Sequence, residues 1–282
     1  MTLLLALLAL AAYFALPDDW RSQAARPATV WADMADRLPS SLGGGIRLAL
    51  CLLLPMVVLA IILQALREVG LSLLVFLPAA LVLIAIFGDI TTPGAVARHL
   101  AHWQSRDWAQ PDADAEQNDW VTDDVALSAE LGEARGELLR ESLRELFSPL
   151  FWFLLATPVA ALGYYLLRRV ARDGQEEIRV LALRWLELAD WIPTRLLALS
   201  FALAGNFTAT WEVIRERLLK PDAEGHALID EAAAAAEPAS LDRTLAPAAA
   251  LTEALDGLQA LLQRALVVWM VMLALHTLWP GI

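Results

Sequence analysis

The stretch SPLFWFLLATPVAALGYYLLRR, residues 148–169, decides the fold of this chain. It is an apolar run that a Ser-Pro pair opens and two arginines close. A helix rises 1.5 Å per residue, so roughly 20 apolar residues cross a hydrocarbon core of about 30 Å. Pro149 suits the first turn of a helix, and Pro158 should kink the helix near its middle. The stretch therefore predicts a transmembrane helix.

The last turn of this helix has the composition of a membrane interface. Tyr164 and Tyr165 are expected to place their rings at the lipid headgroups. Arg168 and Arg169 follow directly, and long basic side chains near a helix end reach into water. This pattern predicts an interfacial end with solvated guanidinium groups.

Composition assigns the whole chain to the membrane proteins. Hydrophobic residues make up 58% of its 282 positions, and the mean hydropathy of +0.52 is too high for a soluble domain of this size. A formal net charge of −12 excludes nucleic acid as a partner, because such a chain cannot neutralise a row of phosphates. The single cysteine, Cys51, lies in an apolar run, which excludes an intramolecular disulfide and a cysteine metal site.

Further apolar segments lie on both sides of the central stretch. Two of them, joined by only Arg67–Gly70, must form an antiparallel hairpin. Residues 170–189 have the period of an interfacial helix. Residues 190–207 have an apolar core too short to span, which favours a re-entrant or buried half-helix, with a tilted span as the alternative. The predicted segments are a retained N-terminal helix at 2–16, the hairpin helices at 46–66 and 71–87, the interfacial helix at 170–189, the short segment at 190–207 and a last span at 265–279.

The expected fold class is therefore all-α: a polytopic integral membrane protein with four to six membrane segments, including re-entrant or interfacial helices. We expect a single membrane domain over 1–282, with the lipid bilayer as its main partner and a multi-pass location in a cell inner membrane. Residues 88–147 predict a polar acidic loop with an amphipathic helix. Residues 221–247 predict a flexible alanine-rich linker that can contain a helical piece.

Metal and cofactor sites are not predicted. Seven acidic residues and no Lys or Arg lie between Asp107 and Asp124, but their spacing fits no EF-hand, so we interpret them as a solvated loop. His99 and His102 are one helical turn apart, and without a third ligand an exposed helix face is the better interpretation. Phosphate-binding loops and hydrolase or metalloprotease motifs are absent from the sequence.

The direction of the central helix conflicts with the charge distribution. The Arg67 hairpin is poor in positive charge and is expected outside the cytoplasm, which places residues 88–147 in the cytoplasm. A crossing central helix would then carry Arg168, Arg169 and Arg172 outside, against the positive-inside rule. Either this helix does not fully cross, or residues 190–207 bring the chain back.

Two arginines next to apolar segments are candidate ligand-binding residues. Arg144 precedes the central helix and Arg195 lies inside an apolar segment, where an ionisable group is costly unless it is paired or lines a polar cavity. Glu141 and Asp190 are the expected carboxylate partners. Together the arginines suit an anion such as a phosphate or a muropeptide carboxylate. The alternative is a pair of structural ion pairs, Glu141–Arg144 and Asp190–Arg195, without a ligand.

Three short stretches carry a family resemblance. They are SRD at residues 105–107, RELFSPLFW at 144–152, and DWIPTRL at 190–196 followed by ALAG at 202–205. Together they resemble the AmpE family of inner-membrane proteins, which is linked to β-lactamase induction, and the similarity runs in order along nearly the whole chain. The resemblance implies a regulatory or sensor protein and adds Arg106 and Asp107 to the candidate ligand-binding residues. It also implies an anionic cell-wall metabolite or nucleotide and proteins of the induction pathway as partners.

A more distant resemblance connects this family with the membrane adenosylcobinamide-phosphate synthases. Those enzymes carry an acidic, asparagine-containing cluster before the corresponding helix, whereas this chain has RESLR at residues 140–144. Glu141 is the one carboxylate that could replace the cluster, and only with a shifted alignment. A non-enzymatic regulator is therefore the leading expectation, and an ATP-dependent amide-forming enzyme is the alternative. A transporter of small anions is disfavoured by the few spans and the absence of an inverted repeat.

Overall fold

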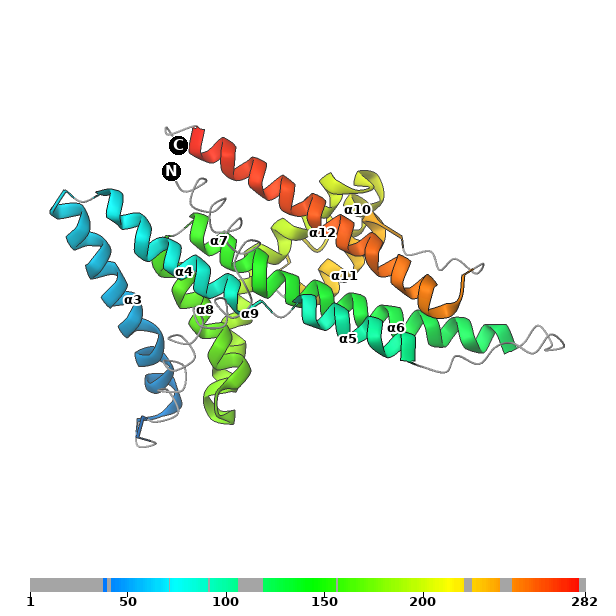
Figure 1. Ribbon diagram of the computed structural model, residues 1–282, viewed down its shortest axis with the longest axis horizontal. Coiled ribbons are helices and arrows are strands. Elements are labelled where there is room, and N and C mark those ends of the chain that lie inside the picture. The colour runs from blue at the N-terminus through cyan, green and yellow to red at the C-terminus, as the bar shows by residue number, and fades with distance from the viewer. Residues whose placement is uncertain are drawn as a thin grey trace. The chain divides into compact units, whose positions relative to one another are not determined.

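The computed structural model describes residues 38–39, 42–70, 72–90, 92–105, 119–155, 157–220, 225–238 and 245–278 (Figure 1). Every regular element in these ranges is helical, which confirms the all-α fold class. The expected single domain divides into two compact units. Unit 1 consists of residues 1–90, 144–193 and 270–282, and unit 2 of residues 91–143 and 194–269. The helix predicted at 2–16 lies outside the described residues.

The two apolar helices predicted on either side of Arg67–Gly70 are present in unit 1, where a short turn joins them and both pack against α8 (Pro158–Asp173). Helix α3 spans Gly44–Glu68, and a short 3₁₀ turn, η1 (Ser72–Val75), leads into α4 (Phe76–Gly88). The chain reverses at Gly70, whose φ of 80° is a left-handed conformation that glycine adopts without steric cost.

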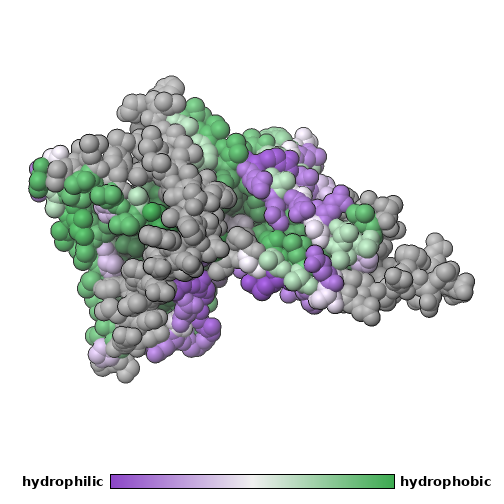
Figure 2. Space-filling model, in the orientation of Figure 1, coloured by the Kyte–Doolittle hydropathy of each residue, from purple (hydrophilic) through white to green (hydrophobic). Residues whose placement is uncertain are grey.

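Helix α3 presents an apolar surface to its surroundings. Only 28% of its most apolar window is buried, which is little for the core helix of a soluble protein. Figure 2 shows hydrophobic residues along this helix at the left of the view. The exposed large aliphatic side chains are Ile46, Leu50, Leu53, Leu54, Val57, Val58, Ile61 and Ile62.

The central stretch forms two helices, so the prediction of one transmembrane helix over 148–169 is wrong. Helix α7 (Ser148–Leu155) ends before Thr157, and α8 (Pro158–Asp173) begins at the proline that was expected only to kink the helix. Proline disfavours the helical conformation of the residue before it, and Thr157 has a φ of 138°, which is strained for a β-branched residue. The two helices pack against each other.

The interfacial end predicted for this stretch is buried instead. The exposed fractions are 4% for Tyr164, 6% for Arg168 and 9% for Arg169. Tyr164 belongs to a core cluster that α3, α8 and α9 share, and the two arginines are paired with carboxylates. The prediction failed because it assigned lipid and water as partners to side chains that have partners within unit 1.

Helix α9 (Glu176–Ala204) replaces the two segments predicted at 170–189 and 190–207. Its residues belong to unit 1 as far as Pro193 and to unit 2 from Thr194. Pro193 lies inside the helix and does not start a new one, although a proline removes one backbone hydrogen bond. The apolar core at Leu196–Ala204 is therefore the continuation of a helix of 29 residues.

The remaining helices lie mainly in unit 2. They are α5 (Thr92–Ser105), α6 (Asp119–Ser142), α10 (Phe207–Ile214), α11 (Gly225–Ala236) and α12 (Pro247–Leu278), and a π-helical turn, η2 (Leu143–Phe147), joins α6 to α7. Helix α11 is a helical piece within the linker predicted at 221–247. Alanine is the best helix former, and Ala232, Ala233 and Ala236 are buried because small side chains allow neighbouring backbones to approach.

Two of the described helices are long and apolar enough to cross a membrane. They are α3 and the Pro247–Met272 part of α12, while the apolar part of α4, Leu77–Phe87, is shorter. The last span predicted at 265–279 forms part of α12, which begins at Pro247 and is described as far as Leu278.

Candidate functional site

The buried carboxylate of Asp190 connects three helical segments of unit 1. Ser148 Oγ donates a hydrogen bond of 2.6 Å to Oδ1, and Tyr164 Oη donates one of 2.7 Å to the same oxygen. Arg144 Nε donates to Oδ2 over 3.2 Å. Both carboxylate oxygens are thereby satisfied, and the arginine neutralises the charge, as a buried carboxylate requires. Asp190 thus fixes Arg144, Ser148 and Tyr164 relative to one another.

The local sequence explains how these donors reach one carboxylate. Arg144 lies in the π-helical turn η2, and Ser148 is the first residue of α7. A π-helical turn changes the direction of the side chains that follow it and is frequent at functional sites. Tyr164 comes from α8, which is packed against α7. Exposed fractions of 26% for the Arg144 side chain and 6% for Asp190 show that the arginine extends from the buried carboxylate toward the surface.

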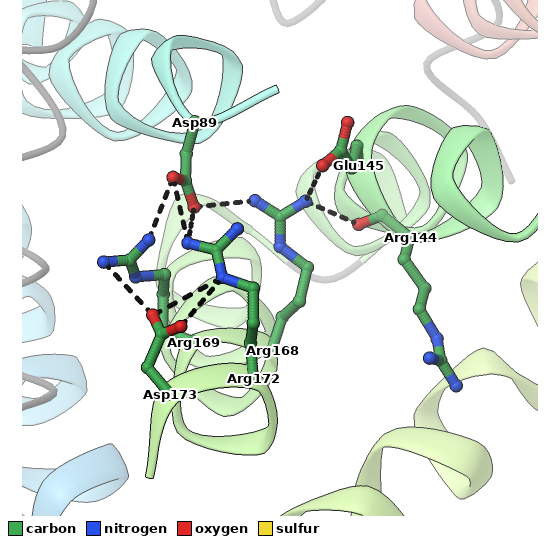
Figure 3. Close-up of polar contacts among 7 residues, drawn as sticks. All are labelled: Asp89, Arg144, Glu145, Arg168, Arg169, Arg172 and Asp173. Atoms are coloured by element: carbon green, nitrogen blue, oxygen red, sulfur yellow. Dashed lines mark hydrogen bonds and ion pairs between the residues drawn. The ribbon is translucent and has the colours of Figure 1, made fainter. Parts of the chain in front are cut away.

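A second ion-pair cluster holds the end of α4 against α8 (Figure 3). Asp89 accepts hydrogen bonds of 3.0 Å from Arg168 Nη2 and from Arg169 Nη1, and one of 3.2 Å from Arg172 Nη2. The three arginines are within four residues of one another on α8, so one face of the helix presents all three to Asp89. Figure 3 shows the Arg144 guanidinium pointing away from this cluster.

Further carboxylates balance the charge of the three arginines. Asp173 lies 3.4 Å from Arg169 Nη2 and 3.1 Å from Arg172 Nε. Glu145 Oε1 lies 3.7 Å from Arg168 Nη1. Three cations therefore face three carboxylates, Asp89 included, and Arg168 and Arg169 are buried, so the cluster offers an anionic ligand little accessible guanidinium. We interpret it as structural.

Arg195, the other candidate, has its observed partners in unit 2. Its Nε donates to the carbonyl of Leu218 over 2.7 Å, and its Nη2 donates to the carbonyl of Lys220 over 2.6 Å. These carbonyls belong to the turn after α10, so the guanidinium stabilises backbone groups at the end of a helix. This arrangement positions a turn.

The structure therefore separates the six candidate residues. It brings Arg144 and Asp190 together in unit 1 and places Arg195 on backbone carbonyls of unit 2. Glu141 lies in α6, which belongs to unit 2. Arg106 and Asp107 lie outside the described residues.

Sequence reasoning missed three residues of these clusters. Ser148 was read only as part of a helix start, and Tyr164 as a headgroup anchor, although each donates to Asp190. Asp89 was not considered at all. Its signal was a lone carboxylate directly after an apolar helix in a chain with three closely spaced arginines elsewhere, because such a charge needs a partner.

Among the described residues, no group of three or more His, Cys, Asp or Glu side chains is arranged to hold a metal ion. His99 instead forms a 2.7 Å hydrogen bond with Glu137 of α6. No protein-family model, no curated protein and no solved structure matches this chain.

Proposed function

We propose that the chain is a multi-pass protein of a bacterial inner membrane, with four to six membrane segments, that acts as a regulatory or sensor protein of the AmpE type. Two helices of sufficient length and the exposed aliphatic side chains of α3 support the membrane location. The regulatory role comes from the motif resemblance, with proteins of the β-lactamase induction pathway as its downstream partners.

The observation that carries this proposal is the meeting of two motif stretches at Asp190. The RELFSPLFW stretch supplies Arg144 and Ser148, and the DWIPTRL stretch supplies Asp190 itself. A pattern shared with a family is more informative when its separated parts form one buried polar cluster, because buried polar networks are costly unless complete. The cluster thus supports the view that the motifs form one structural centre.

Arg144 is the residue of this centre that we assign to ligand recognition. Its Nε is held by Asp190, which orients the planar guanidinium, and its side chain is partly exposed. A guanidinium in a defined orientation favours carboxylate or phosphate groups, which it binds through paired N–H donors. The ligand class is therefore an anionic cell-wall metabolite, such as a muropeptide with free carboxylates, or a phosphate-containing compound.

A reporter of β-lactamase induction tests the proposal in cells. Arg144→Gln removes the charge but keeps an N–H donor for Asp190, and it should abolish the contribution of the protein to induction when strains with equal amounts of the protein in the membrane are compared. Arg184→Gln, on the exposed face of α9, is the matched control and should signal normally. Unchanged induction in the Arg144→Gln strain, with the protein present, would contradict the assigned role.

A further inference from the structure

Neither helix of the central stretch is long enough to cross a bilayer. Helix α7 has 8 residues and α8 has 16, which correspond to lengths of about 12 Å and about 24 Å. A hydrocarbon core of about 30 Å needs roughly 20 helical residues. The polar π-helical turn η2 precedes α7 and the break at Thr157 follows it, so the apolar part of the central stretch contains no continuous helix of spanning length.

The outer ends of α7 and α8 lie together. Arg168 Nη1, near the end of α8, donates to the carbonyl of Arg144, just before α7, over 3.4 Å. One turn further in, Ser148 of α7 and Tyr164 of α8 bind the same oxygen of Asp190. The chain therefore leaves this shared end along α7, reverses at Thr157 and comes back to the same end along α8.

The same end of unit 1 contains the polar ends of the apolar hairpin. The backbone N–H of Gly44, at the start of α3, donates to Glu177 Oε1 over 3.2 Å, just past the end of α8. Arg47 lies 4.0 Å from Glu177. Asp89, directly after α4, binds Arg168 and Arg169. The start of α3, the end of α4 and the end of α8 thus share one side.

We propose that α7 and α8 form a re-entrant hairpin that enters the bilayer from the side of the α3 start and the α4 end and returns to that side. The inference rests on the proposed membrane location, and it resolves the conflict between the central stretch and the positive-inside rule. The strained conformation of Thr157, at the tip, is the sharp turn that reverses the chain inside the membrane.

Charge assigns this shared side to the cytoplasm. The turn after α3, at the opposite end, contributes one arginine, Arg67. Positive residues are enriched on the cytoplasmic side of membrane segments. The shared side has more arginines than the turn after α3, so the shared side is assigned to the cytoplasm. Arginines of unit 1 on the shared side include Arg47, Arg144, Arg168, Arg169 and Arg172.

Single cysteines in the full-length Cys51→Ala chain test the hairpin. Gly43→Cys precedes α3, Val69→Cys lies in the turn after α3, and Glu176→Cys follows α8, and all three positions are exposed. Each variant is labelled in intact cells and in inverted vesicles with a membrane-impermeant maleimide. Carbonate extraction of the same membranes measures integration independently of the labelling.

A re-entrant hairpin predicts that Gly43→Cys and Glu176→Cys are labelled in inverted vesicles and Val69→Cys in intact cells. Labelling of Glu176→Cys in intact cells, from the same side as Val69→Cys, would show that the central stretch crosses the membrane. It would overturn the hairpin while leaving the membrane location intact. Release of the protein by carbonate, or labelling of Gly43→Cys and Val69→Cys from one side, would overturn the proposed multi-pass membrane location itself.

Discussion

At the scale of single residues, Asp190 is the centre of the site because its two oxygens satisfy three donors from different segments. Such a carboxylate is stable in a buried position only while its donors remain in place. Each donor in turn depends on the carboxylate, since a buried hydroxyl or guanidinium without an acceptor carries a desolvation cost.

Asp190→Ala should therefore lower the free energy of unfolding by about 3–5 kcal/mol, the usual cost of breaking a buried charge pair from one side. Thermal unfolding in detergent, followed by tryptophan fluorescence, measures the change. Glu187→Ala, on the exposed face of the same helix, is the control and should leave the midpoint nearly unchanged. Equal unfolding midpoints for the two variants would show that the hydrogen bonds of Asp190 do not stabilise the fold.

A second residue-scale prediction concerns Glu137 in unit 2. The hydrogen bond with His99 lowers the pKa of the Glu137 carboxyl below its ordinary value, with Arg98 adding a smaller effect. Because this pKa is lowered, the contact contributes its full stabilisation at pH values above the ordinary glutamate pKa of about 4.3. The contribution is lost as the pH falls through the folded-state pKa.

His99→Ala should raise the pKa of Glu137 toward the ordinary value, as a ¹³C NMR titration of the carboxyl would show. His102→Ala is the matched control, because His102 lies 4.0 Å from a different carboxylate, Glu130. A pKa that stays low in His99→Ala would mean that the surroundings other than His99 set it.

At the scale of helices, ion pairs and close backbone contacts determine which elements pack together. Asp89 links the end of α4 to α8 through three arginines, two of which are buried. Asp173 contacts two of the same arginines, but its side chain is 42% exposed. Buried charge pairs are costly to break, whereas exposed ones contribute little, so the two carboxylates should differ in their effect on stability.

Asp89→Asn should destabilise unit 1 by about 3–5 kcal/mol, and Asp173→Asn by less than about 1 kcal/mol. Both variants remove one negative charge from the same cluster, so their comparison isolates burial. The measurement is the unfolding midpoint in detergent at low and at high salt, and only the Asp173→Asn effect should vanish in high salt. A larger effect for Asp173→Asn would contradict the structural role of Asp89.

The connection between α9 and α10 meets the end of α11 at a position where only glycine fits. A Cβ at Gly205 would lie 2.5 Å from the carbonyl oxygen of Ala236, and backbone atoms cannot easily move away. Gly205→Ala should destabilise the protein by about 1–3 kcal/mol. Gly257→Ala in α12 meets no atom within 4 Å and should stabilise its helix slightly. Thermal unfolding of both variants tests the contact, and a neutral Gly205→Ala would refute it.

The elements that could be predicted from the sequence are those that local sequence determines. Helix α3 and the turn at Gly70 followed from an apolar run of spanning length and a short polar connection. The break at Thr157 and the continuity of α9 through Pro193 did not follow, because a proline within an apolar helix can kink it, break it or be tolerated. Tertiary contacts decide among these outcomes.

The site was predictable to the same degree. Arg144 and Asp190 were both recognisable as charges beside apolar segments, and the structure brings them together. Their pairing was not recognisable, because Asp190 had a nearer candidate in Arg195 and Arg144 had one in Glu141. Helix direction and the π-helical turn bring the distant pair together, and neither has a local sequence signal.

At the scale of the whole molecule, the chain combines exposed apolar helices with buried clusters of charged residues. Helix α3 and the later part of α12 expose large aliphatic side chains, as a helix in contact with lipid does. Several charged residues of unit 1 are buried in balanced clusters, which allows arginines and carboxylates to lie beside apolar helices at low cost. Arg144 is the member of these clusters to which we assign a ligand.

Ligand binding to the purified full-length protein in nanodiscs tests this assignment most directly. Isothermal titration with an N-acetylmuramyl tripeptide and with inorganic phosphate should show saturable binding of at least one of the two probes. The affinity for that probe should fall at least about tenfold, or 1.4 kcal/mol, in Arg144→Gln and stay unchanged in Arg184→Gln. No binding of either probe, or equal affinity in the two variants, would contradict the account.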